Sequence, residues 1–132
     1  MDKITINEWV SYSDMDLSSA KYLCGMNQKP LEIICYHCQQ SAEKMLKAYW
    51  IYKNINPPRT HDLELLRAEC ENHDDSFAKL HDMCKRLNGY STQPRYPSGI
   101  DLLESDMLLA IKDSEKIAEF VKERIVFDGT DD

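Results

Sequence analysis

Glycine and proline are scarce in this sequence, which has four glycines and five prolines in 132 residues. Both residues interrupt helices, so their scarcity favours long helical segments. The sequence also has no alternating pattern of the kind that predicts a strand, and no internal repeat or low-complexity tract. A glycine-rich phosphate loop is absent too, which excludes P-loop and Rossmann nucleotide sites.

Long apolar runs are also missing. No stretch approaches the roughly 20 apolar residues that span a bilayer, so we expect no membrane segment. The first residues form no apolar h-region, which predicts that there is no signal peptide. Five cysteines is an odd number, so we expect free thiols in a reducing cytoplasm. The net charge of −7 argues against binding duplex DNA through a broadly basic surface.

The residues that are present fit one globular domain. Hydrophobic residues make up 42% and charged residues 30%, which is an ordinary balance for a folded protein. The chain is long enough for one core and too short for two. We therefore expect an all-α fold, a single up-and-down bundle of four to five helices over residues 1–127, with a flexible acidic tail over residues 128–132.

The longest predicted helix covers about residues 31–54. A 4-3-4-3-4 repeat of small and apolar residues predicts a bundle seam on it: Ile34, Cys38, Ser41, Met45, Ala48 and Tyr52. A last helix, over about residues 101–127, repeats the same spacing: Leu103, Met107, Ala110, Ser114, Ile117 and Val121. These two seams predict that the two helices pack in the centre of the bundle.

Three further helical segments are predicted. The first begins at about Asn7, a good N-cap, and places one set of residues on a common face: Trp9, Tyr12, Asp16, Ala20 and Leu23. The third has Thr60 as its expected N-cap and is broken near Asn72. The fourth carries Phe77 and Leu87.

Basic residues gather near the end of the long helix. Lys44 and Lys47 are three residues apart and so share a helix face, and Arg59 and His61 follow toward the same end. Cations beside the free N–H groups of a helix N-terminus favour anions, which predicts a phosphate or nucleotide pocket. The alternative is that the two lysines are solvated positions balanced by Glu43 and that His61 only caps or packs.

A loop rich in turn formers supplies a second candidate site. Arg95 can hold a phosphate or carboxylate through two parallel hydrogen bonds, and Tyr90 and Tyr96 can stack on a base. In the alternative interpretation the loop is a structural strap, in which Arg95 pairs with an acidic helix and both tyrosines pack.

Cysteine spacing suggests zinc only superficially. Cys35-x-x-Cys38 and Cys70-x-x-His73 would supply four ligands. However, the first pair lies inside a predicted long helix, where Cys38 belongs to the apolar seam. We expect neither a metal site nor a cofactor.

Several short motifs together resemble the HEPN (higher eukaryotes and prokaryotes nucleotide-binding) family. They are the pattern around Trp9 and Asp16-Leu17, then Ser41-Ala42-Glu43-Lys44, then Thr60-His61-Asp62-Leu63, and last Arg95-Tyr96-Pro97. The resemblance covers about residues 9–125. It implies a helical bundle that forms a homodimer, is often encoded beside a small nucleotidyltransferase, and is akin to the helical domain of aminoglycoside nucleotidyltransferases.

Many HEPN proteins are metal-independent ribonucleases with an Arg-x(4–6)-His motif, in which acid–base and electrostatic catalysis cleave RNA. Here no histidine follows Arg95, and the spacing matches only at Arg67 and His73. On an uninterrupted helix these two positions point about 120° apart. Arg67 and His73 are therefore weak catalytic candidates.

Three functions are consistent with the sequence. The resemblance favours a noncatalytic bundle that binds a nucleotide or a nucleotidyltransferase partner through Lys44, Lys47, Arg59, His61, Arg95 and Tyr96. The alternatives are a metal-independent RNase toxin of a toxin–antitoxin pair and a purely structural dimerisation module.

Overall fold

The computed structural model describes residues 3–91 and 102–125, and within these ranges every regular element is a helix. The long helices are α1 (Lys3–Leu23), α2 (Leu31–Tyr52) and α5 (Glu104–Arg124). Between α2 and α5 lie α3 (Leu63–His73), the 3₁₀ helix η1 (Asp75–Leu80), α4 (His81–Leu87) and the 3₁₀ turn η2 (Asn88–Tyr90). The predicted all-α fold is confirmed. No helix in the described ranges is both long and apolar enough to cross a membrane.

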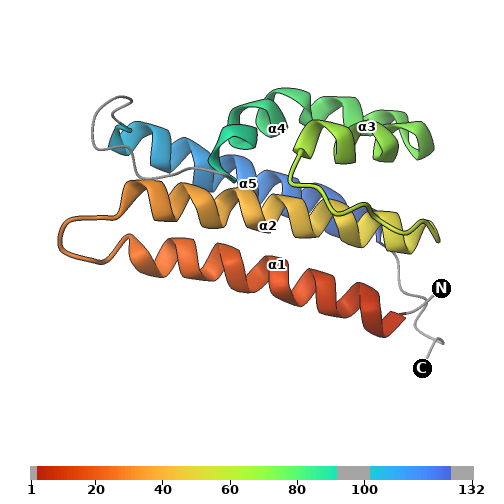
Figure 1. Ribbon diagram of the computed structural model, residues 1–132, viewed down its shortest axis with the longest axis horizontal. Coiled ribbons are helices and arrows are strands. Elements are labelled where there is room, and N and C mark those ends of the chain that lie inside the picture. The colour runs from red at the N-terminus through yellow and green to blue at the C-terminus, as the bar shows by residue number, and fades with distance from the viewer. Residues whose placement is uncertain (1–2, 92–101, 126–132) are drawn as a thin grey trace.

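Helix α2 is the central element of the bundle. Figure 1 shows α1 antiparallel to it on one side, α3 and α4 on the opposite side, and α5 behind it. Its predicted seam is buried from Ile34 to Ala48, while Tyr52 at the end is only partly buried. The predicted seam of α5 is buried from Met107 to Val121. These two apolar faces form the core, because the neighbouring helices cover them.

Small polar residues let the long helices approach closely. Ser13 of α1 donates its hydroxyl to the carbonyl of Ser41 at 2.7 Å, and the two hydroxyls lie 3.1 Å apart. Ser114 of α5 donates to the carbonyl of Cys38 at 3.0 Å. The side chains of these four residues are fully buried. The serine hydroxyls therefore make their hydrogen bonds within the protein, where no water can reach them.

The ends of the helices differ from the predictions. Helix α1 begins at Lys3, not at Asn7, since the extra turn buries Ile6 completely. Tyr12, placed on a common face with Ala20 in the sequence, is 57% exposed, whereas Ala20 and the neighbouring Ser13 are fully buried. Leu103 was predicted to face inward but lies at the N-cap of α5 and is exposed. Asp101 and Phe127, the predicted limits of that last helix, lie outside the described residues.

The N-cap of α3 is Asp62, not the predicted Thr60. The Asp62 carboxylate accepts from the backbone N–H groups of Glu64 and Leu65 at 3.0 and 3.3 Å. The Asn88 side chain also donates to it at 3.0 Å, which ties the end of α4 to the start of α3. His61 therefore precedes the helix, on the segment that connects α2 to α3.

We expect Asp62→Ala to lower the free energy of unfolding by about 1 kcal/mol at neutral pH, the typical cost of losing an N-cap. Thr60→Ala is the matched control. Among the described residues the Thr60 hydroxyl accepts only from the N–H of Asp62, at 3.1 Å, so its loss should cost clearly less. Urea denaturation of both variants checks the assignment, and equal losses would contradict it.

The cap also predicts a pH dependence. The hydrogen bond from Asn88, followed by the backbone N–H groups, lowers the pKa of Asp62 below its usual value. A carboxyl group with a lowered folded-state pKa stabilises the fold above its unfolded pKa, and this contribution disappears as the pH falls through the folded value. The difference between wild type and Asp62→Ala should therefore shrink in acid.

Candidate functional site

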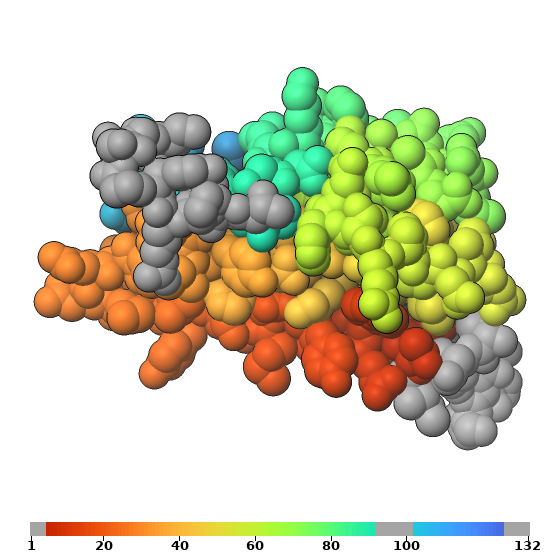
Figure 2. Space-filling model, in the orientation of Figure 1, coloured from red at the N-terminus to blue at the C-terminus, as the bar shows by residue number. Residues whose placement is uncertain are grey.

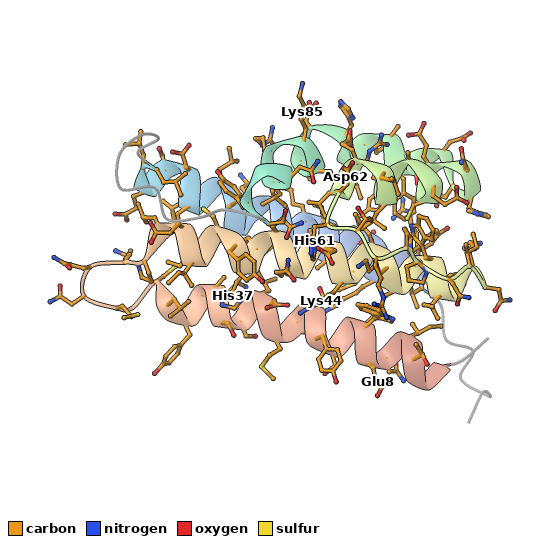
Figure 3. All side chains as sticks on the ribbon, in the orientation of Figure 1. Glu8, His37, Lys44, His61, Asp62 and Lys85 are labelled. Atoms are coloured by element: carbon orange, nitrogen blue, oxygen red, sulfur yellow. The ribbon has the colours of Figure 1, made fainter. Side chains whose placement is uncertain are left out.

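A row of polar side chains runs along one face of α2. His37, Gln40, Lys44 and Lys47 follow one another at 3-4-3 spacing and so lie on one face of the helix. We call the cluster that they form with their neighbours the polar strip: Asp16, His37, Gln39, Gln40, Glu43, Lys44, Lys47 and His61. Figure 3 shows His37, Lys44 and His61 on the same face of the molecule. On this face the segment between α2 and α3 (yellow-green) lies against α2 (Figure 2).

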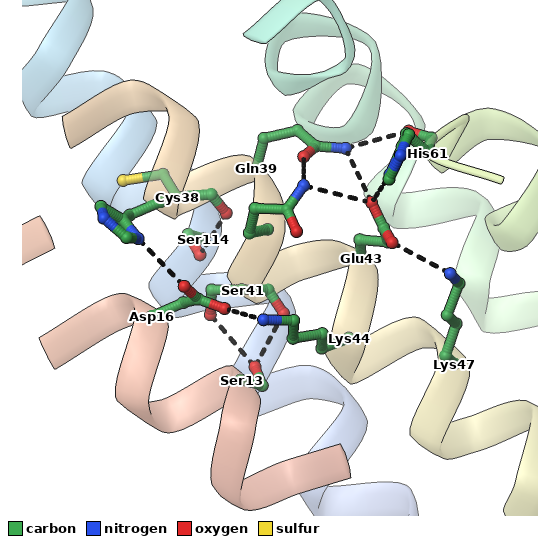
Figure 4. Close-up of polar contacts among 12 residues, drawn as sticks. Ser13, Asp16, Cys38, Gln39, Ser41, Glu43, Lys44, Lys47, His61 and Ser114 are labelled. Carbon is green, nitrogen blue, oxygen red and sulfur yellow. Dashed lines mark hydrogen bonds and ion pairs between the residues drawn. The ribbon is translucent and has the colours of Figure 1, made fainter. Parts of the chain in front are cut away.

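The buried carboxylate of Glu43 is the centre of one half of the polar strip (Figure 4). Lys47 Nζ donates to it at 2.9 Å, and His61 Nδ1 lies 2.9 Å from its other oxygen. The amides of Gln39 and Gln40 approach the same oxygen at 3.5 Å. Gln39 also donates to the carbonyl of His61 at 2.9 Å. Together these contacts hold the segment that carries His61 against α2.

Asp16 of α1 is the centre of the other half (Figure 4). One of its oxygens lies 2.9 Å from His37 Nδ1, and the other accepts from Lys44 Nζ at 2.6 Å. The polar strip thus repeats one arrangement twice, a carboxylate that holds one lysine and one histidine. With neutral imidazoles its formal charge is zero, because two lysines balance two carboxylates.

Three of the basic residues predicted to bind phosphate differ sharply in exposure. The Lys47 side chain is only 9% exposed, and its ammonium lies over the ring of Trp9, 5.7 Å from the centroid. Lys44 is 27% exposed and paired with Asp16. The alternative that both lysines are solvated is therefore wrong, although Glu43 does balance Lys47 as that interpretation held. By contrast, 60% of the His61 side chain is exposed.

The imidazole of His61 is both oriented and accessible. A carboxylate accepts hydrogen bonds, so the Nδ1 nitrogen that faces Glu43 carries the proton. The Nε2 nitrogen bonds to no described residue and is left for a ligand. Arg59, two residues earlier, is exposed and has no acidic partner within residues 3–91 and 102–125. Arg59 and His61 are thus the two available groups among the predicted site residues that the structure describes.

Arg67 and His73 are held apart by separate carboxylates. The buried guanidinium of Arg67 donates to Glu64 at 2.7 Å and also pairs with Glu71. Burial lowers the pKa of Arg67, but these two ion pairs outweigh it and leave the pKa raised. His73 is paired with Glu69 at 3.2 Å. No hydrogen bond joins the two candidates, and Arg67 already has the partners that a buried cation needs.

The loop candidates Arg95 and Tyr96 lie outside the described residues. Tyr90, the third member of that set, is half-buried and packs against the core. Burial raises its pKa to about 12. Tyr90 therefore packs, as the strap interpretation expects.

The sulfur groups belong to the core. All five cysteines are free, and Cys35, Cys38 and Cys70 are buried among apolar side chains. Burial raises the pKa of the Cys35 thiol to about 11, which keeps it protonated at neutral pH. No group of three or more histidine, cysteine and acidic residues that could hold a metal occurs in the part of the chain that the structure describes.

Comparison with known proteins agrees with this architecture. The family model for the HEPN domain matches residues 6–124. The chain belongs to the HEPN family. The fold also matches the crystal structure of ST0689, an archaeal HEPN homologue, with a TM-score of 0.74 and 23% sequence identity over 96% of this chain and 100% of that one. No curated protein matches the sequence.

Within this HEPN bundle, only part of the polar strip was predicted from the sequence. Asp16 was placed only on the common face of the first predicted helix, yet its side chain is 13% exposed and bridges two helices. His37, Gln39 and Gln40 were not singled out. One signal could have found Gln39, Glu43 and Lys47, since polar residues at i, i+4 and i+8 lie beside the apolar seam of a central helix.

Proposed function

We propose that this HEPN-family chain is a noncatalytic binding module whose ligand is a nucleotide. The phosphate groups would be held at the His61 end of the polar strip, by the guanidinium of Arg59 and by the imidazolium form of His61, in which Nε2 also carries a proton and can donate to a phosphate oxygen. The proposal continues the expectation drawn from the basic residues and narrows it to the two described ones that have no ion-pair partner occupying their outer face.

The observation that carries the proposal is the pairing of an exposed imidazole with a buried carboxylate. Breaking a buried ion pair costs several kcal/mol, and an apolar replacement of the whole pair is often as stable. The stability of the helix packing therefore does not require the charges of Glu43 and Lys47, since an apolar pair could replace them. They do, however, orient His61 while leaving its outer face open, and a pre-oriented donor loses little freedom on binding.

The noncatalytic part of the proposal rests on Arg67 and His73. Catalysis by an arginine and histidine pair needs both groups on one phosphodiester, within hydrogen-bond reach. Glu64 and Glu71 already hold Arg67, and Glu69 holds His73. These ion pairs support a structural role for Arg67 and His73 in α3.

Isothermal titration with ATP tests the binding function. We expect the Arg59→Ala/His61→Gln double variant to bind at least ten-fold more weakly than wild type, because charged hydrogen bonds to phosphate contribute about 1.5–3 kcal/mol each. Lys85→Ala is the control, since this exposed lysine lies on α4, away from the polar strip (Figure 3).

Three outcomes would contradict the proposal. Equal affinity of the double variant and wild type would remove Arg59 and His61 from the site. The absence of any nucleotide-induced rise in melting temperature would favour a module that only dimerises. Metal-independent cleavage of single-stranded RNA, abolished by His73→Ala, would favour the ribonuclease alternative.

A further inference from the structure

The side chain of Asn88 joins the end of α4 to the start of α3. Its amide oxygen accepts from the backbone N–H of Leu63 at 2.8 Å, and its amide nitrogen donates to the Asp62 carboxylate at 3.0 Å. We call these two contacts the Asn88 joint. An amide suits this place because it carries an acceptor and a donor on the same carbon. The joint depends on the amide, since a carboxylate in its place could accept but not donate.

The residue that follows Asn88 makes this asparagine chemically reactive. Of the six asparagines in the sequence, only Asn88 precedes a glycine. Asparagine is thermolabile because the backbone nitrogen of the next residue can attack its side-chain carbonyl carbon, and glycine hinders that attack least because it has no side chain. Gly89 is exposed, and a Cβ built on it would meet nothing within 4 Å. The space beside the attacking nitrogen is therefore open.

The closed Asn88 joint slows this reaction. Asn88 has helical backbone angles, with φ −61° and ψ −25°, whereas ring closure requires a ψ far outside the helical range. Both ends of its amide are also held, by Leu63 and Asp62. Deamidation in the folded chain therefore requires a local opening, in which the amide leaves both partners and the turn η2 unwinds.

The products of deamidation no longer fit the joint. The Gly89 nitrogen forms the new C–N bond of a succinimide, and the side-chain nitrogen leaves as ammonia with the proton of that N–H group. Water then opens the ring to aspartate or isoaspartate, with no change of oxidation state. An aspartate at position 88 still accepts from Leu63, but it turns a second carboxylate toward Asp62, and like charges this close repel. The hydrogen bond from Asn88 is also the main cause of the lowered pKa of Asp62, so its loss weakens the cap of α3.

We propose that Asn88 is a deamidation site, and that its conversion irreversibly loosens the contact between α4 and the start of α3. The closed joint protects the amide, and each opening of the joint exposes it to conversion. His61 directly precedes Asp62, so the segment with Arg59 and His61 loses its attachment at the α3 end and keeps the one at Glu43. This inference does not depend on nucleotide binding.

Prolonged incubation of the purified chain at mildly alkaline pH tests the site. Peptide mass spectrometry locates the converted asparagine, and we expect Asn88 to convert before the other five. Gly89→Ala is the matched variant, because the open space admits its methyl group without a clash. It should keep the helical circular-dichroism signal and convert about ten-fold more slowly, since a side chain on the attacking residue hinders ring closure.

A second pair of variants tests the protection by the joint. Asp62→Ala removes the acceptor of the Asn88 amide and should speed conversion about five-fold, the rise in open population that the loss of one hydrogen bond produces. Phe77→Leu is the control, because it destabilises the fold without touching the joint. It separates local opening from global unfolding and should speed conversion clearly less than Asp62→Ala.

Asn88→Asp reproduces one product and tests the consequence. It should lower the urea midpoint at neutral pH, and the loss should shrink in acid as the facing carboxyl groups take up protons. The proposal would be overturned if Asn88 stayed intact in the folded chain while it converted in urea. Equal conversion rates in wild type and Gly89→Ala, or an Asn88→Asp variant as stable as wild type, would also overturn it.

Discussion

Replacing Glu43 with methionine is expected to lower the free energy of unfolding by about 3–5 kcal/mol, because it leaves the ammonium of Lys47 buried and unpaired. The side chains of Glu43 and Lys47 are 5% and 9% exposed, and the amides of Gln39 and Gln40 also lose an acceptor. Few single changes elsewhere in the chain should cost as much. Urea denaturation measures the loss directly.

The double variant Glu43→Met/Lys47→Met is the control for this result. When both charges are removed, no buried ion is left without a partner, so the double variant should be more stable than Glu43→Met alone. A double-mutant cycle gives the coupling between the two side chains. Additive losses would show that the two charges do not interact and would contradict the arrangement in Figure 4.

Phe77→Ala has the second large expected effect, again about 3–5 kcal/mol, the usual cost of removing a buried phenylalanine ring. Phe77 is fully buried in η1, with the rings of Tyr49 and Phe120 at centroid distances of 4.6 and 5.0 Å. It joins η1 to α2 and α5, so the loss of its ring opens a cavity where three elements meet.

Two milder variants keep this second prediction testable if Phe77→Ala does not fold. Phe77→Leu retains most of the volume and should lose clearly less stability. Leu65→Ala, on the exposed side of α3, should stay within about 0.5 kcal/mol of wild type, as surface changes usually do. A loss at Leu65 equal to that at Phe77 would contradict the burial assigned to η1.

The long helices were predictable because their pattern is strong and local. Seams at 4-3-4-3-4 spacing correctly placed Ser41 and Ile117, both fully buried, in the core. Helix ends were less predictable, because capping depends on contacts that are distant in sequence. Asp62 rather than Thr60 is the N-cap of α3 partly because Asn88, 26 residues later, donates to the Asp62 carboxylate.

The candidate site shows the same limit more strongly. Lys44 and Lys47 look alike in sequence, but each has a different carboxylate, one from α1 and one from its own helix. Local spacing could suggest the pair Glu43 and Lys47. It could not suggest that Asp16, 21 residues away, would hold His37, because that contact exists only once α1 and α2 pack.

The net charge of the chain differs from the local charge of the polar strip. The chain carries a net charge of −7, which opposes the approach of a polyanion to most of its surface. Within the polar strip, however, the carboxylates are matched by lysines and histidines. A nucleotide that reaches the His61 end of the strip therefore meets paired acids, the exposed imidazole of His61 and the exposed guanidinium of Arg59.

Backbone amide chemical shifts recorded during a titration with ATP test the central claim most directly. We predict progressive shifts at Arg59–His61 and at Glu43–Lys47, with none along Arg67–His73. The account would be contradicted by a spectrum that does not change at saturating ATP, or by shifts that gather at Arg67 and His73 and leave the polar strip unaffected.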